Sequence, residues 1–217
     1  MTMTRLWRWR LVAAGGGVLL LAGCGNLFTT RQMAASDYVL SAAETLPERA
    51  AQGAAGATPS LVLLRPVPAA GLDSQRIAVV FADGRMDAYQ GADWASELPQ
   101  LVQDQVLTAL RRSGTVGNAL PDTAPFASDW QLRIDITHFE AVYKSAGAAP
   151  LVRVAWVATL GRRSDRAVTA TLAIDQQQQA DANQLAAVLR AFNAATAAAL
   201  AQLDDWTGRQ LAAGAGR

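Results

Sequence analysis

The residue with the most distinctive chemistry in this chain is its only cysteine, Cys24. It closes the run Leu21-Ala22-Gly23-Cys24, at the end of an apolar segment that begins at Leu11. Three arginines precede this segment, Arg5, Arg8 and Arg10, and the first acidic residue is Asp37. A basic start, an apolar stretch and small residues before a cleavage point are typical of a secretory signal peptide.

A transmembrane anchor is the main alternative for this segment. Leu11 to Ala22 is only twelve residues long, whereas about 20 apolar residues are needed to cross a bilayer. The three consecutive glycines at 15–17 also weaken a helix. A buried core cysteine, the second alternative, would leave the arginines unexplained. We therefore predict a cleaved signal peptide over residues 1–23.

The four residues Leu21, Ala22, Gly23 and Cys24 resemble the lipobox of bacterial lipoproteins. This resemblance implies cleavage between Gly23 and Cys24, a thioether between the thiol and diacylglycerol, and acylation of the new amino group. Two or three acyl chains hold a protein on a membrane firmly, whereas one chain is marginal. Because Gly25 and not Asp follows the cysteine, the resemblance implies the outer membrane of a Gram-negative bacterium, with the protein facing the periplasm.

The composition of the remaining chain limits its function. Removing residues 1–23 takes away three of the 19 basic residues and none of the 18 acidic ones, which leaves a net charge of −2. That balance argues against nucleic acid as a partner, because phosphate-binding proteins carry a basic excess. One histidine and one lipidated cysteine cannot supply a zinc site, so we predict no metal and no cofactor.

The chain divides into a signal peptide, a lipidated tether over 24–36, a single α/β domain over 37–211 and a tail over 212–217 that we expect to fray. The first half of the domain is predicted to hold four strands, over 37–40, 60–65, 76–81 and 85–90, with a loop over 41–59. Asp83-Gly84 separates the last two strands. That dipeptide favours a tight hairpin, because such turns need positive φ angles.

A helical period follows, with apolar residues at steps of three and four between Asp93 and Arg112. Asp93 is a plausible N-cap. Pro99 indicates that the regular helix begins near residue 98, with the proline in its first turn. Gly114 is expected to end it, and residues 115–128 are expected to form a loop.

Three alternating segments come next, over 130–137, 152–160 and 168–174, and predict an antiparallel meander. The last helix is predicted over 182–211, with Asp181 and Gln184 at the spacing of a capping box. The order is therefore β-β-β-β-α-β-β-β-α. This predicts an α+β fold in two layers: a mainly antiparallel sheet with two long helices packed on one face.

Candidate catalytic residues are few. Counted by twos from Trp130, the single histidine His138 falls on the face of Leu132, Ile134 and Ile136, which favours a structural role. Asp135 and several serines leave a Ser-His-Asp arrangement open, but the sequence has no Gly-x-Ser-x-Gly motif. We predict no catalytic residue.

The tryptophans Trp130, Trp156 and Trp206 lie on predicted core faces. Trp94, directly before the first helix, is either a core residue or an exposed contact for a partner. We name it with Asp83 and Gly84 of the hairpin as the candidate partner contacts.

The order of several short motifs resembles a known family. They are Tyr38-Val39-Leu40 after the lipobox, the strand Leu61 to Pro66, Gly71-Leu72-Asp73 with Arg76-Ile77, Tyr89, Trp94-Ala95 with Leu98-Pro99, and His138-Phe139-Glu140-Ala141. Together they resemble the ABC-type transport auxiliary lipoproteins, the lipoprotein partners of MCE (mammalian-cell-entry) lipid transport systems of the paraquat-inducible type. The resemblance implies a subunit without enzymatic activity that supports the movement of lipid between membranes. It also implies an MCE-domain protein and ABC transporter subunits as partners, and a possible homo-oligomer.

Two other functions remain open from the sequence. One is a lipoprotein that assists the assembly of outer-membrane proteins or lipopolysaccharide. The other is an anchored hydrolase centred on His138.

Overall fold

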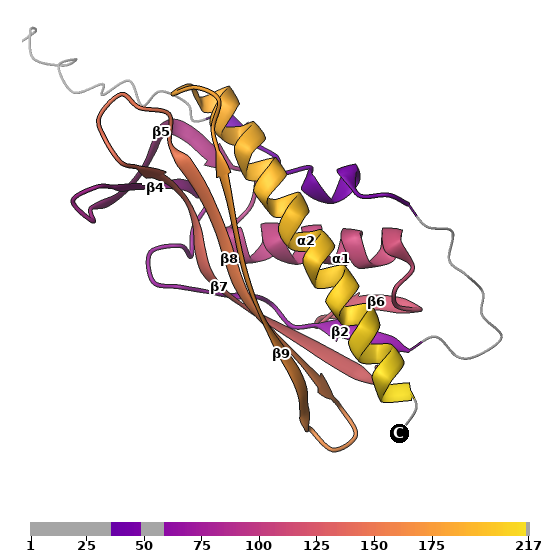
Figure 1. Ribbon diagram of the computed structural model, residues 1–217. Coiled ribbons are helices and arrows are strands. Elements are labelled where there is room, and N and C mark those ends of the chain that lie inside the picture. The colour runs from indigo at the N-terminus through magenta and orange to yellow at the C-terminus, as the bar shows by residue number, and fades with distance from the viewer. Residues whose placement is uncertain (1–35, 49–58, 216–217) are drawn as a thin grey trace, which may run out of the picture. The chain divides into compact units, whose positions relative to one another are not determined.

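A computed structural model describes residues 36–48 and 59–215 (Figure 1). The predictions on the signal peptide, the lipobox Leu21-Ala22-Gly23-Cys24 and the tether up to residue 35 lie outside the described residues. The elements are β1 (Ser36–Tyr38), the 3-10 helix η1 (Ala42–Thr45), β2 (Ser60–Leu63), β3 (Val67–Pro68), β4 (Arg76–Phe81), β5 (Met86–Trp94), α1 (Leu98–Ser113), β6 (Asn118–Pro121), β7 (Trp130–Tyr143), β8 (Leu151–Arg162), β9 (Val168–Gln179) and α2 (Leu185–Ala215).

The sheet is organised around β7, its longest strand. On one side β7 pairs along its length with β8, and β8 pairs with β9, both antiparallel. On the other side β7 pairs in parallel with β2, β3 and β4 at successive positions. The remaining strands extend this second side, β5 beside β4, β1 beside β5 and β6 beside β2. The long ladders are thus antiparallel and the short ones parallel, which confirms the predicted meander and fold class.

Both helices lie on one face of this sheet and enclose the core. The helix α2 packs along β8 and β9, and α1 packs against α2 and β6 (Figure 1). By length and hydropathy α2 could cross a bilayer, but its inner side packs on the sheet, as in the core helix of a domain. One continuous apolar core joins the elements from Leu40 to Leu211. The described residues from Ser36 onward belong to one compact unit, so we expect this part of the chain to fold alone.

The hairpin predicted at Asp83-Gly84 is confirmed. β4 and β5 are antiparallel, and Gly84 has a φ of 81°. Its backbone N–H donates to the carbonyl oxygen of Phe81 over 2.9 Å. The glycine is needed here because side chains with a Cβ are disfavoured at positive φ.

The helix boundaries differ from the prediction in their caps. Asp93 lies inside β5, so it is not the N-cap of α1; Glu97 occupies that position, with Pro99 in the first turn as predicted. Gly114 ends the helix in the left-handed conformation, also as predicted. β5 is longer than its sequence pattern predicts, because β1 pairs with the last residues of β5.

The second helix begins at Leu185, three residues later than predicted, and continues to Ala215. Asp181 is therefore not the N-cap of α2. Its carboxylate forms an ion pair with Arg190 at 3.7 Å. The carbonyl of Gln184 accepts the N–H of Val188 over 3.1 Å, which starts the helical pattern. The predicted fraying from residue 212 is wrong at least as far as Ala215.

Three short elements occur in segments predicted as loops: η1, β3 and β6. β3 and β6 contain prolines and are only two and four residues long, so they show no alternation. The segment that holds η1 is fixed by tertiary contacts instead. The N–H of Ala43 donates to Oε1 of Gln105, and the N–H of Ser41 donates to Oδ1 of Asn193, both over 2.8 Å.

A β-bulge at Thr137 changes the phase of β7. Ile136 pairs with Trp156 and His138 pairs with Ala155, so Thr137 is the extra residue. After it the inward positions are Phe139 and Ala141, both at most 1% exposed. The prediction that His138 shares the face of Ile136 is therefore wrong, because counting by twos fails across a bulge.

Candidate functional site

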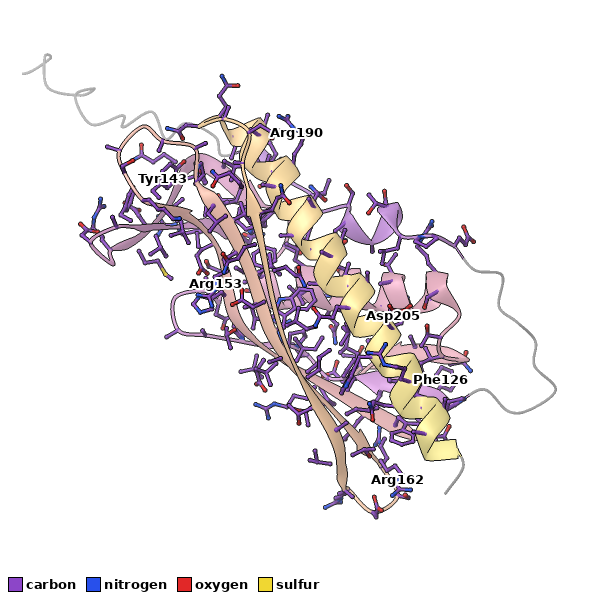
Figure 2. All side chains as sticks on the ribbon, in the orientation of Figure 1. Phe126, Tyr143, Arg153, Arg162, Arg190 and Asp205 are labelled. Atoms are coloured by element: carbon purple, nitrogen blue, oxygen red, sulfur yellow. The ribbon has the colours of Figure 1, made fainter. Side chains whose placement is uncertain are left out.

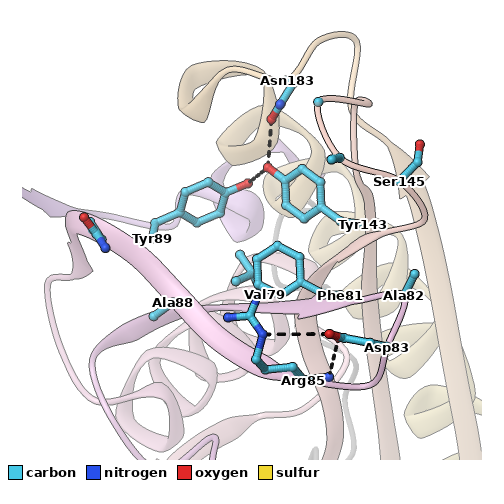
Figure 3. A pocket seen from close by; sticks show the side chains of 13 residues that line it. Val79, Phe81, Ala82, Asp83, Arg85, Ala88, Tyr89, Tyr143, Ser145 and Asn183 are labelled. Carbon is cyan, nitrogen blue, oxygen red and sulfur yellow. Dashed lines mark hydrogen bonds and ion pairs between the residues drawn. The ribbon is translucent and has the colours of Figure 1, made fainter.

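The main candidate site is a hollow of about 620 Å³ at one end of the sheet (Figure 3). The β4–β5 hairpin forms one wall, and the end of β7 with the turn that follows forms another. Asn183, just before α2, closes a third side. The side chains of Val79, Phe81 and Ala88 give it an apolar lining. A hollow of this size and lining is typical of a binding site.

Three polar groups line the hollow as a connected series. The Tyr143 hydroxyl donates to Oδ1 of Asn183 over 2.8 Å, so the Tyr89 hydroxyl, 2.7 Å away, donates to Tyr143. Burial, and next the hydrogen bond to Tyr143, raise the pKa of Tyr89 well above its ordinary value. The hydrogen bonds thus hold both phenols in fixed orientations, and the raised pKa keeps Tyr89 neutral.

The aromatic lining continues from Tyr143 to Phe81 and Arg85. The rings of Tyr143 and Phe81 stack with centroids 5.8 Å apart. The guanidinium of Arg85 lies 4.3 Å from the centre of the Phe81 ring, a cation–π contact. Arg85 also pairs with Asp87 at 3.2 Å and with Asp83 at 4.0 Å. The charges of Arg85, Asp83 and Asp87 are therefore paired within the hairpin, and the rest of the lining offers aromatic, amide and hydroxyl groups. This surface suits an uncharged segment of a partner.

The predicted contacts Asp83 and Gly84 lie at the exposed tip of the hairpin, and Asp83 lines the hollow. That they contact a partner stays a prediction. Of the two alternatives for Trp94, the structure shows the core residue: this side chain is 1% exposed, so its choice as an exposed partner contact is wrong. Its ring packs edge-on against Phe139 and Phe192, with centroids 5.9 and 5.3 Å away. β5 extends to residue 94 and turns the indole into the core.

His138 lies on the face of the sheet opposite the helices. Its Nδ1 lies 2.7 Å from Oε1 of Glu140, whose side chain is 5% exposed. The other carboxylate oxygen accepts the backbone N–H of Phe139. Within the described residues Glu140 is the only hydrogen-bond partner of the imidazole, so the structure shows a pair and not a triad. Those residues also contain no group of His, Cys, Asp and Glu that could hold a metal ion.

Sequence reasoning found the hairpin but missed Tyr143 and Asn183. These residues and Tyr89 come from three separate segments, 54 and 40 residues apart along the chain. No local spacing connects them. The only usable signal was the hairpin itself, since it forms a wall of the hollow.

Comparison with solved structures supports the fold. Protein XCC0632 from Xanthomonas campestris, of the DUF330 family, is 26% identical with a TM-score of 0.68, and the match covers 85% of this chain and 98% of that one. A second solved structure, of an uncharacterised protein, is 14% identical with a TM-score of 0.58, and covers 79% and 97%. This second likeness shows the fold alone. No curated protein matches the chain.

Comparison with family models gives a match over most of the domain. The model of the ABC-type transport auxiliary lipoprotein component matches residues 38–203, a range that includes β2 to β9, α1 and the first part of α2. This match agrees with the order of motifs found in the sequence. The chain therefore belongs to the family of ABC-type transport auxiliary lipoprotein components.

Proposed function

We propose that this lipoprotein is anchored at the outer membrane through acylated Cys24 and docks an MCE-type ABC transport system from the periplasmic side. It acts as a binding subunit without catalytic activity, and the system moves lipid or another hydrophobic molecule. The hollow beside the β4–β5 hairpin receives a segment of the MCE-domain protein.

One observation carries this proposal. A hollow of about 620 Å³ lies beside the hairpin tip, and its lining is aromatic and hydrogen-bonding, with the charge of Arg85 paired. Interfaces between proteins are enriched in aromatic residues and depleted of unpaired charge at their centre. Family membership supplies the association with an ABC transport system.

The test fills the hollow without touching the core. Ala146 lines the hollow and is exposed, so Ala146→Trp should block entry of a partner segment while the domain folds normally. Ala173→Trp is the matched control, because Ala173 is exposed on β9, outside the hollow. After crosslinking in the periplasm, the parent and the control should recover the MCE-domain protein, and Ala146→Trp should lose it.

Other outcomes select the alternatives. Recovery of an outer-membrane barrel protein without any MCE protein would favour the assembly function. Loss of cellular function on His138→Ala, in a protein with unchanged thermal unfolding, would favour a hydrolase. Equal recovery by all three proteins in the crosslinking test would remove the hollow as the docking site.

The anchor has a separate test. The intact mass of detergent-extracted protein should equal the chain from Cys24 onward plus its acyl groups. Cys24→Ser should release a folded domain from the membrane fraction, because the described residues from Ser36 onward enclose a core of their own. An unmodified Cys24 still joined to residues 1–23 would contradict the proposed anchor.

A further inference from the structure

The turn between β8 and β9 concentrates positive charge at one end of the domain. It holds Arg162, Arg163 and Arg166, here called the arginine turn, and a single acid, Asp165. Figure 2 shows Arg162 at the end of the domain opposite Tyr143 and the hollow. Arg166 has a φ of 57°, the only positive value on a non-glycine residue among the described residues.

Two of these arginines have no carboxylate partner within the described residues. Asp165 pairs with Nε of Arg162 at 3.8 Å, but no ion pair involves Arg163 or Arg166. Arg163 donates from Nη1 to the hydroxyl of Ser128 over a long 3.4 Å.

The other acid of this region, Asp129, is engaged elsewhere. Its Oδ2 accepts the backbone N–H of Ser60 over 2.9 Å and the Ser60 hydroxyl over 2.8 Å. These bonds lower the pKa of Asp129 and hold its carboxylate on β2. Among the described residues, two guanidinium groups thus have no carboxylate partner and are able to meet an anion.

The surroundings of the turn are apolar as well as basic. Val168, which pairs with Gly161 beside the turn, is 68% exposed. Phe126 is 67% exposed and belongs to the loop that Arg163 contacts at Ser128. Figure 2 shows Phe126 in the same half of the domain as Arg162. A second hollow, of about 380 Å³, opens between this loop and the turn, with Trp130 in its wall.

We propose that the arginine turn, with Phe126 and Val168, binds the phosphate headgroups of anionic phospholipids at a membrane surface. Guanidinium groups bind phosphate oxygens in a fork, and the negative potential of an anionic leaflet attracts arginine. Exposed aromatic and aliphatic side chains beside such arginines enter the boundary between headgroups and acyl chains. A free phosphate ion would use the arginines alone, so the apolar flank identifies a membrane as the source. This inference does not depend on the MCE partnership.

The experiment measures flotation of residues 36–217 with lipid vesicles. This part of the chain contains the whole described core and carries no acyl anchor. It should bind vesicles of phosphatidylcholine mixed with phosphatidylglycerol, and not vesicles of phosphatidylcholine alone. Replacing Arg162 and Arg163 by Gln and Arg166 by Asn should lower the affinity on the order of a hundredfold, at roughly fivefold for each arginine.

The matched control removes the same charge elsewhere. Arg76, Arg133 and Arg190 are exposed, and each pairs with an acid, so replacing all three by Gln should leave binding nearly intact. A loss equal to that of the arginine-turn variant would overturn the proposal, since net charge alone would then explain the binding. Thermal unfolding checks that both variants are folded.

Two further arms separate the lipid surface from a soluble anion. Phe126→Ser should weaken binding severalfold and keep the preference for anionic vesicles. Inorganic phosphate, at matched ionic strength, should compete no better than chloride. Full displacement by inorganic phosphate, together with no effect of Phe126→Ser, would overturn the membrane as the source of the phosphate. Equal binding to both kinds of vesicle would overturn the proposal altogether.

Discussion

The two ends of the sheet both carry arginine, but only one end neutralises it. At the hairpin, Arg85 has acids two residues away on either side, Asp83 and Asp87, and pairs with both. At the opposite end, the arginine turn offers a single acid to three guanidinium groups. The position of acidic residues around arginine, more than the number of arginines, therefore decides what each end can bind. The paired end suits a neutral protein segment, and the unpaired end suits an anionic surface.

The largest expected effect is a difference in the free energy of unfolding between variants at the two ends. Trp130 is 7% exposed and packs so closely on Gly214 of α2 that a Cβ there would lie 2.8 Å from its ring. Trp130→Ala should lower the free energy of unfolding by about 3–5 kcal/mol. At the hollow, Tyr143→Phe keeps the ring and removes two hydrogen bonds, so it should cost about 1–2 kcal/mol. Urea unfolding measures the loss of unfolding free energy for both variants. Equal losses would contradict a difference in stability between the two ends.

An effect of intermediate size is expected from the different backbone conformations of the two turns. Gly84 at φ 81° suits its position, whereas Arg166 at φ 57° is strained. The left-handed conformation destabilises a residue with a Cβ by about 1–2 kcal/mol. Glycine avoids this cost, but it increases the entropy of the unfolded chain, which lowers the free energy of unfolding by about 0.4–1 kcal/mol. Arg166→Gly should therefore raise the free energy of unfolding by roughly 0.5–1 kcal/mol, and Gly84→Ala should lower it by a similar amount. Thermal unfolding checks the signs, and a destabilising Arg166→Gly would show that the arginine side chain holds its turn together.

The smallest effect is confined to alkaline pH. Folding raises the pKa of Tyr89 above the ordinary value near 10, mainly through burial. The unfolded chain then loses this proton first, so the contribution of Tyr89 is complete below about pH 10 and declines as the pH rises further. Urea midpoints measured across that range should fall more steeply for the parent than for Tyr89→Phe. Parallel curves would mean that Tyr89 ionises freely in the folded protein.

The hairpin and the meander could be predicted because their signals are local. Asp83-Gly84 specifies its turn through the backbone, and alternation along 130–137 specifies one buried face. The same alternation misplaced His138, because a bulge adds a residue without changing the sequence pattern. Trp94 was undecided for a related reason: the end of β5 depends on its pairing with β1, which lies more than 50 residues earlier.

The two candidate sites could be predicted only in part. The hairpin wall was visible, but the series from Tyr89 to Asn183 depends on three segments that meet only in the fold. The arginine turn was visible as a polar turn between two strands. Its free charge was not, because that depends on Asp129 bonding to Ser60 and not to Arg163.

The helix α2 gives these two ends a fixed separation. It starts two residues after Asn183, which closes the hollow, and near its other end Gly214 lies against Trp130, in the wall of the second hollow. At 1.5 Å per residue its 31 residues make a helix about 46 Å long. Because α2 packs on β8 and β9, we expect the domain to act as a rigid spacer. Whatever is held at the hollow is kept one helix length away from whatever the arginine turn touches.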